Sequence, residues 1–379
     1  MANTLTGLIP SLYAGLDTVA REAVGLIPAV NRNSNAERAA VGEAVTYPIT
    51  PAITGVDVTP SMQVPEPTDR TIATGSITIT KTRAFEFGFV GEEALGLNNG
   101  PGYNLVQADL FAQAVRGLVN EVESDLGTLA RTTASSAIGA AGTTPFASGI
   151  GASALARKAM IDAGSPQSDL HMAINTTTGA NLRSNMQLTQ ANTAGTDDTL
   201  RRGVLLDLNG FAIRETGAPT INGGSAAQSG YLVNGSLALG ATTIPIDTGS
   251  AAINAGDVFT IAGDTTQYVA TNSVTGPGNL TIARPGLRVA PADNAAITFV
   301  GAYSGNAVFH RQALQLVMRA PALEGGNDAA VDSTMLQDPV SGLILEVRKY
   351  TGYRKTRFEV AMAWGVDNTK PEFTHLLLG

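Results

Sequence analysis

The longest regular spacing of apolar residues in this chain runs from Asn104 to Ala134 and predicts a single amphipathic helix. Gly100-Pro101-Gly102 breaks the chain just before it, and Asn104 can cap the first turn. About thirty helical residues span about 45 Å, so we expect other layers to cover this rod. Six apolar side chains recur at steps of three or four residues and share one face: Phe111, Val115, Leu118, Val122, Leu126 and Leu129.

Two glycines, Gly117 and Gly127, interrupt the predicted helix, and each costs about 1 kcal/mol relative to alanine. Either they let another backbone approach closely, or they let the rod bend. An ordinary core helix with two tolerated glycines is the alternative.

Extended segments precede the helix. In residues 45–90, two arms with alternating apolar residues flank an irregular tip that contains Pro60, Pro65 and Pro67. A hairpin this long cannot bury itself within its own subunit, so we expect it to lie on another molecule. Further upstream, residues 8–30 predict a short helix on an arm, and residues 31–41 read as a polar loop.

The pattern after the long helix changes to helix, strand, helix. Residues 153–163 predict a helix, Leu170–Asn175 a strand, and the following TTTGANLRSNMQL a second helix with threonines at its cap. Residues 205–219 read as a turn at Asn209-Gly210 that opens into a strand. This alternation predicts a compact α+β domain.

From about Gly230 to Gly301 the sequence consists of short strands separated by glycine, asparagine and proline turns, without a helical period. This pattern predicts a small β-barrel or sandwich. Because the α+β pattern resumes with NAVFHRQALQLVMRAPAL, we interpret the stretch as an insertion.

The C-terminal part predicts a β-hairpin with a two-residue turn at Thr351-Gly352, and a basic cluster lies on it. In that register Lys349 faces Arg354 and Arg348 faces Lys355, and like charges directly opposite each other destabilise a hairpin. Three interpretations of the cluster stay open: a solvated face, contact with acidic side chains of a neighbouring subunit, and contact with phosphate.

Composition narrows the function classes. The chain has no cysteine and only three histidines, which excludes thiol chemistry and disfavours an all-histidine metal site, so we expect no metal and no cofactor. A net charge of −8 argues against a dedicated nucleic-acid-binding domain. No apolar run is long enough to span a membrane, which predicts a soluble protein. Charged residues make up only 15% of the chain, which predicts a surface largely covered by partners.

The sequence contains no recognisable set of residues that could catalyse a reaction. Gly149-Ile150-Gly151, followed by Ala154, matches the glycine pattern of a dinucleotide loop and opens a predicted helix, but no strand precedes it. His171 and His310 each lie in a predicted strand beside an apolar residue, as packed structural histidines do. We therefore expect no enzyme, and a nucleotide-binding enzyme is the alternative that the glycine loop alone supports.

The order of these parts resembles the major capsid proteins of tailed bacteriophages with the Hong Kong 97-type fold. The closest likeness is to coat proteins of short-tailed Salmonella phages, which carry an inserted β-rich domain. The segments NAVFHRQALQLVMRAPAL, DLNGFAIRETGAP, AMAWGVDNTKPEF and GDVFTIAG carry the resemblance. It implies an α+β fold with an N-terminal arm, an extended E-loop, a spine helix, and peripheral and axial domains.

The resemblance also implies a division of the chain, a function and a set of partners. The implied parts are the arm (1–43), the E-loop (44–90), the spine helix with the peripheral domain (91–204), the axial domain (205–229 and 302–379) and the inserted β-domain (230–301). The implied function is the structural subunit of an icosahedral phage head, a virion capsid assembled in the host cytoplasm that encloses double-stranded DNA without sequence-specific binding. Implied partners are further copies in hexamers and pentamers, a scaffolding protein, a portal protein and a decoration protein. An encapsulin-like compartment shell is the alternative within the same fold.

Contacts between subunits have candidates in two places. Some shells of this fold are locked by an isopeptide bond from an E-loop lysine to an asparagine of the next subunit. No lysine of this chain lies between Val56 and Thr74, and Lys81 lies toward the base of the loop, so we expect non-covalent contacts. The candidate residues are Glu66, Asp69 and Arg70 on the E-loop, and Arg348, Lys355 and Arg357 in the basic cluster.

Overall fold

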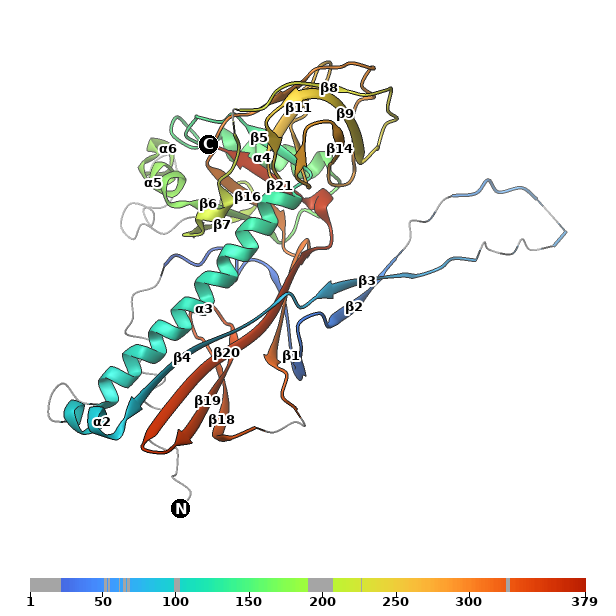
Figure 1. Cartoon of the computed structure of the whole chain (residues 1–379). Helices are drawn as coiled ribbons and strands as arrows, with labels where there is room; N and C mark the ends of the chain where they lie inside the picture. Colours follow the sequence, from blue (N-terminus) through green and yellow to red (C-terminus); the bar gives the residue numbers. More distant parts are fainter. Residues whose placement is uncertain are drawn as a thin grey trace.

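The computed structural model describes residues 22–379 apart from 51–52, 54, 61, 64–65, 67–68, 99–102, 190–206, 226 and 325–327. A long helix lies along a six-stranded sheet, and a five-stranded sheet with a β-module lies at one end of that helix (Figure 1). A long hairpin projects away from this body. The described residues therefore form the mixed α+β architecture that the sequence predicts.

Helix α3 spans Tyr103–Thr133, so each end lies within one residue of the predicted end. Its predicted stripe is buried in the main core, with only Leu129 partly exposed. A Cβ at Gly117 would lie 2.6 Å from the ring of Phe85, and one at Gly127 would lie 2.8 Å from the Thr220 hydroxyl. Both glycines therefore allow a close approach, but the nearest atoms belong to side chains and not to a backbone as predicted.

The six-stranded sheet has the order β1-β17-β20-β19-β18, and β4 also pairs with β20. One face of β20 packs on α3, where Phe358 and Trp364 are buried together with Phe111. Alternating aromatic residues of β4, read from the sequence as one face of a strand, join the same core. The strands are β1 (Asn31–Ala39), β4 (Lys81–Val90), β17 (Leu314–Pro321), β18 (Ala330–Gln337), β19 (Ile344–Gly352) and β20 (Lys355–Asn368), and the short helix α2 (Gly91–Asn98) follows β4.

Strand β1 shows that the polar loop predicted for residues 31–41 is wrong. Its sequence NRNSNAERA is poor in β-forming residues, yet it pairs in parallel with β17 from Asn31↔Gln315 to Ala39↔Pro321, with an irregularity after Ser34. Because β1 is an edge strand among the described residues, its backbone gains hydrogen bonds while most of its polar side chains stay in water. Pairing with a distant strand overrides local propensity here.

The segment before β1 is a turn and belongs to the core. Leu26, Ile27 and Val30 are fully buried beside α3, and no helix occurs in residues 22–30. The helix predicted within residues 8–30 is expected to end at Gly25 and Pro28, so it is wrong for residues 22–24, and residues 8–21 lie outside the described chain.

The five-stranded sheet has the order β5-β21-β16-β6-β7. The turn predicted at Asn209-Gly210 precedes β7, and both of its residues have positive φ, as predicted for such a turn. Asn175, rather than a threonine, caps α5 by accepting a hydrogen bond from the Thr178 N–H at 2.7 Å. The elements are β5 (Ser136–Gly139), α4 (Gly151–Asp162), β6 (Leu170–Asn175), α5 (Thr176–Ser184), α6 (Met186–Thr189), β7 (Phe211–Thr216), η2 (Pro219–Ile221), β16 (Gly305–His310), η4 (Pro371–Phe373) and β21 (Thr374–Leu378).

The two sheets divide the chain differently from the predicted parts. Strand β6, assigned from the sequence to the same part as α3, lies in one sheet with β7, β16 and β21. Residues 302–379 are also divided, because β16 and β21 join the five-stranded sheet while β17 to β20 join the six-stranded one. These pairings join segments far apart in sequence, which local periodicity does not reveal.

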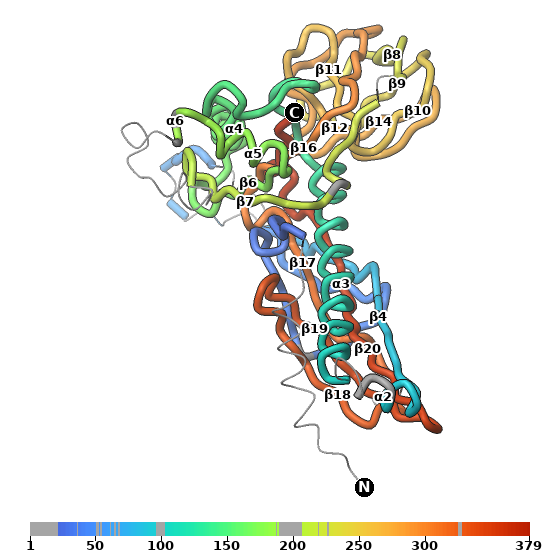
Figure 2. Tube along the Cα trace, turned by 90° about the vertical axis from the view of Figure 1, so that its left-hand side faces the viewer, coloured from blue at the N-terminus to red at the C-terminus, as the bar shows by residue number. Residues whose placement is uncertain are grey.

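Strands β8 to β15 form a β-module of three small sheets with a core of its own (Figure 2). A second cluster joins the module to the body, because Val258, Val269 and Tyr303 pack with Ala137 and Leu376. The module is therefore docked on the five-stranded sheet. Its strands are β8 (Ser229–Val233), β9 (Thr243–Ser250), β10 (Ala252–Ile253), β11 (Val258–Ile261), β12 (Tyr268–Val269), β13 (Val274–Thr275), β14 (Gly278–Thr281) and β15 (Ile297–Phe299).

Candidate inter-subunit surfaces

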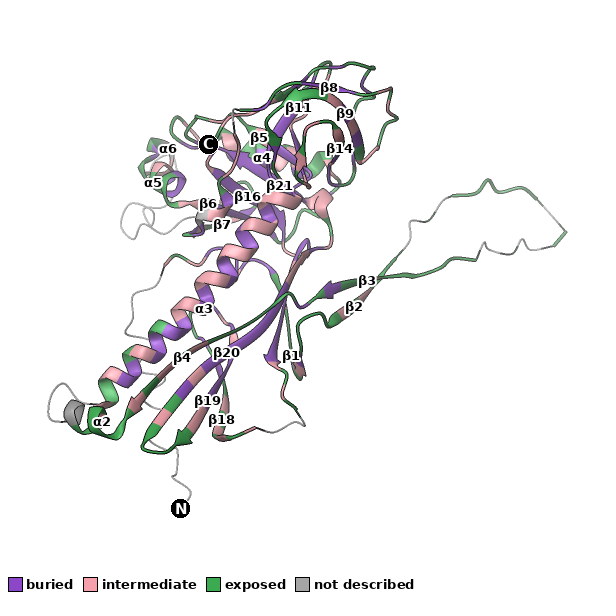
Figure 3. Cartoon of the chain, viewed as in Figure 1, coloured by how far each residue is buried: buried purple, intermediate pink, exposed green. Residues whose placement is uncertain are grey.

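The projecting hairpin exposes apolar side chains to water. Strands β2 (Ala44–Ile49) and β3 (Ala73–Thr78) form its stem, and the described residues between them form no strand. Val56 is 89% exposed, Val58 98% and Met62 106%, and the tip is exposed throughout its described part (Figure 3). In the single chain these apolar side chains stay in contact with water. A partner that covered them would remove this contact, and the burial would stabilise the complex.

The candidates Glu66, Asp69 and Arg70 lie on this tip, and all three are exposed. The sequence indicates these charges, and it also carries a signal for the apolar side chains beside them. The alternation of Val56 and Val58, with a polar residue between them, is the signal that indicates an extended apolar edge.

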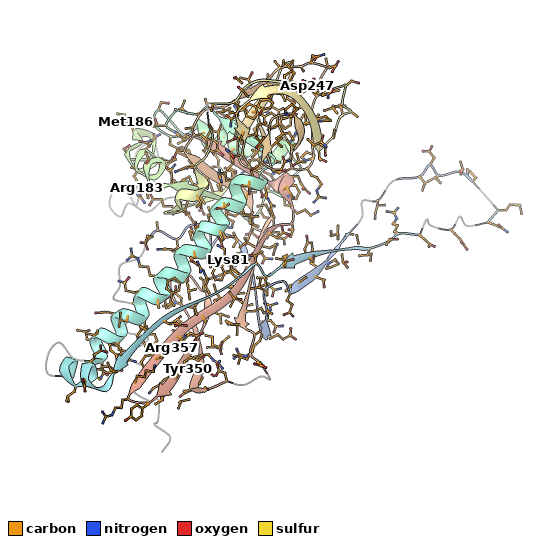
Figure 4. The ribbon with its side chains drawn as sticks, in the orientation of Figure 1. Lys81, Arg183, Met186, Asp247, Tyr350 and Arg357 are labelled. Atoms are coloured by element: carbon orange, nitrogen blue, oxygen red, sulfur yellow. The ribbon has the colours of Figure 1, made fainter. Side chains whose placement is uncertain are left out.

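The base of the hairpin is firmly held. Ile77 and Ile79 are buried in a cluster with Val317 and Ala363 of the six-stranded sheet. Lys81 lies just beyond this base (Figure 4), and its Nζ is 2.6 Å from the Asp125 carboxylate of α3. The hairpin therefore projects from a rigid anchor.

The C-terminal hairpin has a different register from the predicted one. Its turn is Tyr353-Arg354, where Arg354 has a φ of 57°, so Gly352 pairs with Lys355 and Arg348 pairs with Glu359. The predicted opposition of like charges is wrong. Each basic residue gains an acidic, aromatic or neutral neighbour across the strands, which removes the repulsion.

Arg348 is enclosed within its own chain. It is 5% exposed, forms an ion pair with Asp328, and places Nε 3.2 Å from the carboxylate of Glu346. Arg38 of β1 binds the same Glu346 with both arms of its guanidinium, at 2.5 and 2.9 Å. The two arginines stabilise the buried Glu346 carboxylate, and little of Arg348 remains for a neighbouring subunit.

Tyr350 extends this network toward the end of the sheet. Its hydroxyl donates to Asp328 at 2.8 Å, and burial with this carboxylate raises the pKa of Tyr350 to about 12. Arg357, one strand away, forms an ion pair with Glu86 of β4 and lies over the Tyr350 ring (Figure 4). The Arg357 side chain stays half-exposed, so unlike Arg348 it is accessible to a partner.

Lys355 lines a cavity of about 710 Å³ at the far end of the molecule from the projecting hairpin. Phe89 and Tyr103, whose rings lie 5.0 Å apart, supply an aromatic wall, and Arg354 joins Lys355 on the basic side. The cavity leaves no signal in the sequence, because it forms where β4, α2, α3 and the C-terminal hairpin meet. The lining is apolar and carries two basic residues and one acidic residue, Glu92.

The described residues show no chemical centre. They contain no group of three or more histidine, cysteine, aspartate or glutamate side chains that could hold a metal ion. No strand occurs in residues 140–150 before α4, so the glycine pattern at its start lacks the geometry of a dinucleotide loop. Within the described part of the chain, no helix is long and apolar enough to cross a membrane.

Comparison with known proteins gives matches among solved structures only. Neither a protein-family model nor a curated protein matches the chain. The capsid structure of the cyanophage P-SCSP1u is similar over 95% of this chain and 89% of that chain, with a TM-score of 0.51 and 15% sequence identity.

Two further structures are more distant. That of Mycobacterium phage Che8 covers 95% of this chain and 94% of its own, with a TM-score of 0.46 and 13% identity. The virus-like particle from Pyrococcus furiosus covers 97% and 96%, with a TM-score of 0.42 and 12% identity. The likeness to the cyanophage structure shows the fold, and over 95% of its length this chain therefore has the fold of a phage capsid structure, as its resemblance predicts.

Proposed function

We propose that this protein is the structural subunit of an icosahedral bacteriophage head, a closed shell that encloses double-stranded DNA. One observation carries the proposal: a chain with a capsid fold projects a rigidly anchored hairpin whose apolar side chains are exposed. The subunit is incomplete by itself, because only another molecule can cover these side chains.

In this proposal the parts of the fold take the family's names. The projecting hairpin is the E-loop, α3 is the spine helix, and the six-stranded sheet along α3 is the peripheral domain. The five-stranded sheet with α4 and α5 is the axial domain, and β8 to β15 form the inserted domain. The arm includes the buried turn at Leu26 and Ile27.

Charge supports contact between the E-loop and a second copy. Asp57, Glu66 and Asp69 outnumber Arg70 on the described tip, so the tip is acidic, whereas Arg354 and Lys355 outnumber Glu92 in the distal cavity, so the cavity is basic. The tip and the cavity lie at opposite ends of one molecule (Figure 1), so they can meet only between molecules. A contact between two different surfaces of identical subunits builds rings or larger assemblies rather than isolated pairs. Exposed ion pairs contribute only about 0–1 kcal/mol each, so apolar burial must supply most of the affinity.

The remaining partners follow from this role. Hexamers and pentamers of the chain form the shell, a scaffolding protein guides assembly, a portal protein admits DNA, and a decoration protein binds outside. The shell assembles in the host cytoplasm and contacts DNA without reading its sequence. A net charge of −8 suits a container for DNA that must not bind its contents tightly.

Negative-stain microscopy and analytical centrifugation of the purified protein test the proposal. We expect closed particles of uniform size. If the chain does not assemble alone, the test is repeated with a co-expressed scaffolding protein. DNA protected from nuclease inside particles from infected cells distinguishes a phage head from an encapsulin-like compartment. A monomer that persists at high concentration with scaffold present would contradict a shell.

Substitutions on the E-loop sharpen the test. Val58→Asp and Met62→Asp should abolish assembly while leaving the melting temperature of the free subunit unchanged, because neither side chain contacts the body. Leu239→Asp is the matched control, since Leu239 is 67% exposed but lies on the β-module. Assembly that survives both E-loop substitutions would show that the tip does not hold neighbours.

A further inference from the structure

A cavity of about 400 Å³ lies where the β-module meets the five-stranded sheet and helix α4. Strands β5 and β21 contribute to it from the sheet, α4 forms one wall, and loops of the module form the other. The proposed role of the chain as a shell subunit does not use this cavity. The lining residues that matter here are Ser136, Lys158, Asp162, Gln267, Arg288 and His375.

Two residues that line this cavity have buried polar atoms without a hydrogen-bond partner. They are Nε2 of His375, whose side chain is completely buried, and Oε1 of Gln267. Buried polar atoms are nearly always satisfied, and each exception calls for a partner such as a ligand. The occurrence of two such atoms on one cavity points to a ligand that satisfies both.

Neighbouring hydrogen bonds assign the chemistry of the two atoms. Ser135 Oγ donates to the Thr374 carbonyl, and Ser136 Oγ lies 2.8 Å from His375 Nδ1. We assign the Ser136 hydrogen to Nδ1, which leaves the ring proton on Nε2 as a donor. Gln267 donates its Nε2 to the Gly139 carbonyl at 2.8 Å, so its Oε1 is an acceptor. The cavity therefore offers one donor and one acceptor.

The charge of the cavity is positive. Lys158 and Asp162 neutralise each other across 2.5 Å, and this bond lowers the pKa of Asp162. Arg288 is exposed, and no carboxylate of the described chain forms a salt bridge with it. Arg288 also lowers the pKa of Asp162 through its charge, and the two cations and one carboxylate of the cavity together leave one positive charge beside the donor and the acceptor.

We propose that this cavity binds inorganic hydrogen phosphate. The oxygens of the anion accept hydrogen bonds from Arg288 and from His375 Nε2, and its O–H donates to Gln267 Oε1. Sulfate at neutral pH has the same shape and charge but no O–H, so it leaves the Gln267 oxygen unsatisfied. A phosphate monoester, which is mostly the dianion above pH 7, lacks the O–H as well. Comparing the binding of the three anions therefore distinguishes the proposed site from non-specific attraction of any anion to a cation.

Equilibrium dialysis of the full-length protein at pH 7.5 and fixed ionic strength tests the site with inorganic phosphate, sulfate and methyl phosphate. We expect one saturable phosphate per chain and at least about tenfold weaker binding of the other two anions, the value of one hydrogen bond to a charged group. Equal binding of sulfate and phosphate, or no saturable phosphate, would overturn the proposal.

Three variants locate the binding. Arg288→Gln should weaken phosphate binding about tenfold or more, whereas Arg284→Gln, an exposed arginine of the same module that does not line the cavity, should leave it unchanged. Gln267→Met removes the acceptor but keeps the backbone bond from Ala137 to residue 267. It should abolish the discrimination between phosphate and sulfate, an effect that loss of structure alone does not produce. Full discrimination in Gln267→Met, or normal binding in Arg288→Gln, would refute the assignment.

Discussion

Glu123, at the middle of α3, accepts a hydrogen bond from the backbone N–H of Gly25 at 2.7 Å. The same carboxylate accepts from the N–H groups of Leu26 and Ile27 and from the Thr216 hydroxyl, and the residue is 3% exposed. Four donors replace the water that this charge lost on burial. Glu123 thus ties the buried turn before β1 and the end of β7 to one point on α3.

Glu123→Gln should lower the free energy of unfolding by about 2–4 kcal/mol, because the amide keeps one acceptor and turns an NH₂ group toward N–H donors. Denaturant unfolding of the free subunit measures the loss, and hydrogen exchange at residues 25–27 should accelerate. Glu121→Gln is the control, since its partly exposed ion pair with Arg83 is worth at most about 1 kcal/mol. Equal losses in both variants would contradict a special role for Glu123.

Gly25→Ala should destabilise the subunit by about 1–3 kcal/mol, since a Cβ there would lie 2.5 Å from the backbone oxygen of Glu215. A backbone atom cannot move aside as a flexible side chain can. Gly151→Ala, in the first turn of α4 with no atom within 4 Å of the added Cβ, should be neutral or slightly stabilising. Thermal melts of the two variants give the comparison, and an unchanged Gly25→Ala protein would show that the turn can shift.

Stability should fall as the pH falls from 6.5 to 4. Burial, followed by repulsion from nearby arginines, lowers the pKa of His171 and of His375 to about 4, from about 6.5 in an unfolded chain. In this window the unfolded chain binds protons that the folded chain does not, so each histidine removes up to about 1.4 kcal/mol per pH unit on acidification.

Comparison with His171→Met isolates one histidine, because the carboxylates titrate alike in both proteins. Unfolding in urea at several pH values from 7 to 4 should give a shallower loss of stability for the variant. Parallel curves for the two proteins would show that His171 takes up its proton in the folded state.

The β-module, expressed alone as residues 228–303, should give a β-rich circular dichroism spectrum and a cooperative melt, because it has its own core. It should melt at a lower temperature than within the full chain, since Val258 and Val269 lose their contacts with Ala137 and Leu376. A random-coil spectrum would show that the body is needed for the module to fold.

Assembled particles boiled in denaturant should run on a gel as one band near 38.9 kDa. Lys81, the lysine at the base of the E-loop, is paired there with Asp125, and no lysine lies on the tip. A ladder of larger bands that disappears in Lys81→Arg would establish a covalent bond from this lysine.

The sequence by itself determined the elements that depend on local periodicity. The spacing of apolar residues predicted α3 to within one residue at each end, and the boundaries of Leu170–Asn175 were predicted without error. The all-β character of residues 230–301 followed from closely spaced turn residues. Helix α3 buries one face and the strand Leu170–Asn175 is a short buried run, so in both cases the pattern lies in neighbouring positions of the sequence.

Only the tertiary structure decided how distant segments pair. In the predicted register Arg348 pairs with Lys355, and in the structure it pairs with Glu359. The two registers differ by an even number of residues, so every side chain of the strand keeps the same face. The pattern of apolar residues therefore fits both registers equally well. Strand β1 exists because β17 offers an unpaired edge, and its own residues do not favour it. The roles of Glu123 and of the cavity at Arg288 likewise arise from segments tens to hundreds of residues apart, which packing alone brings together.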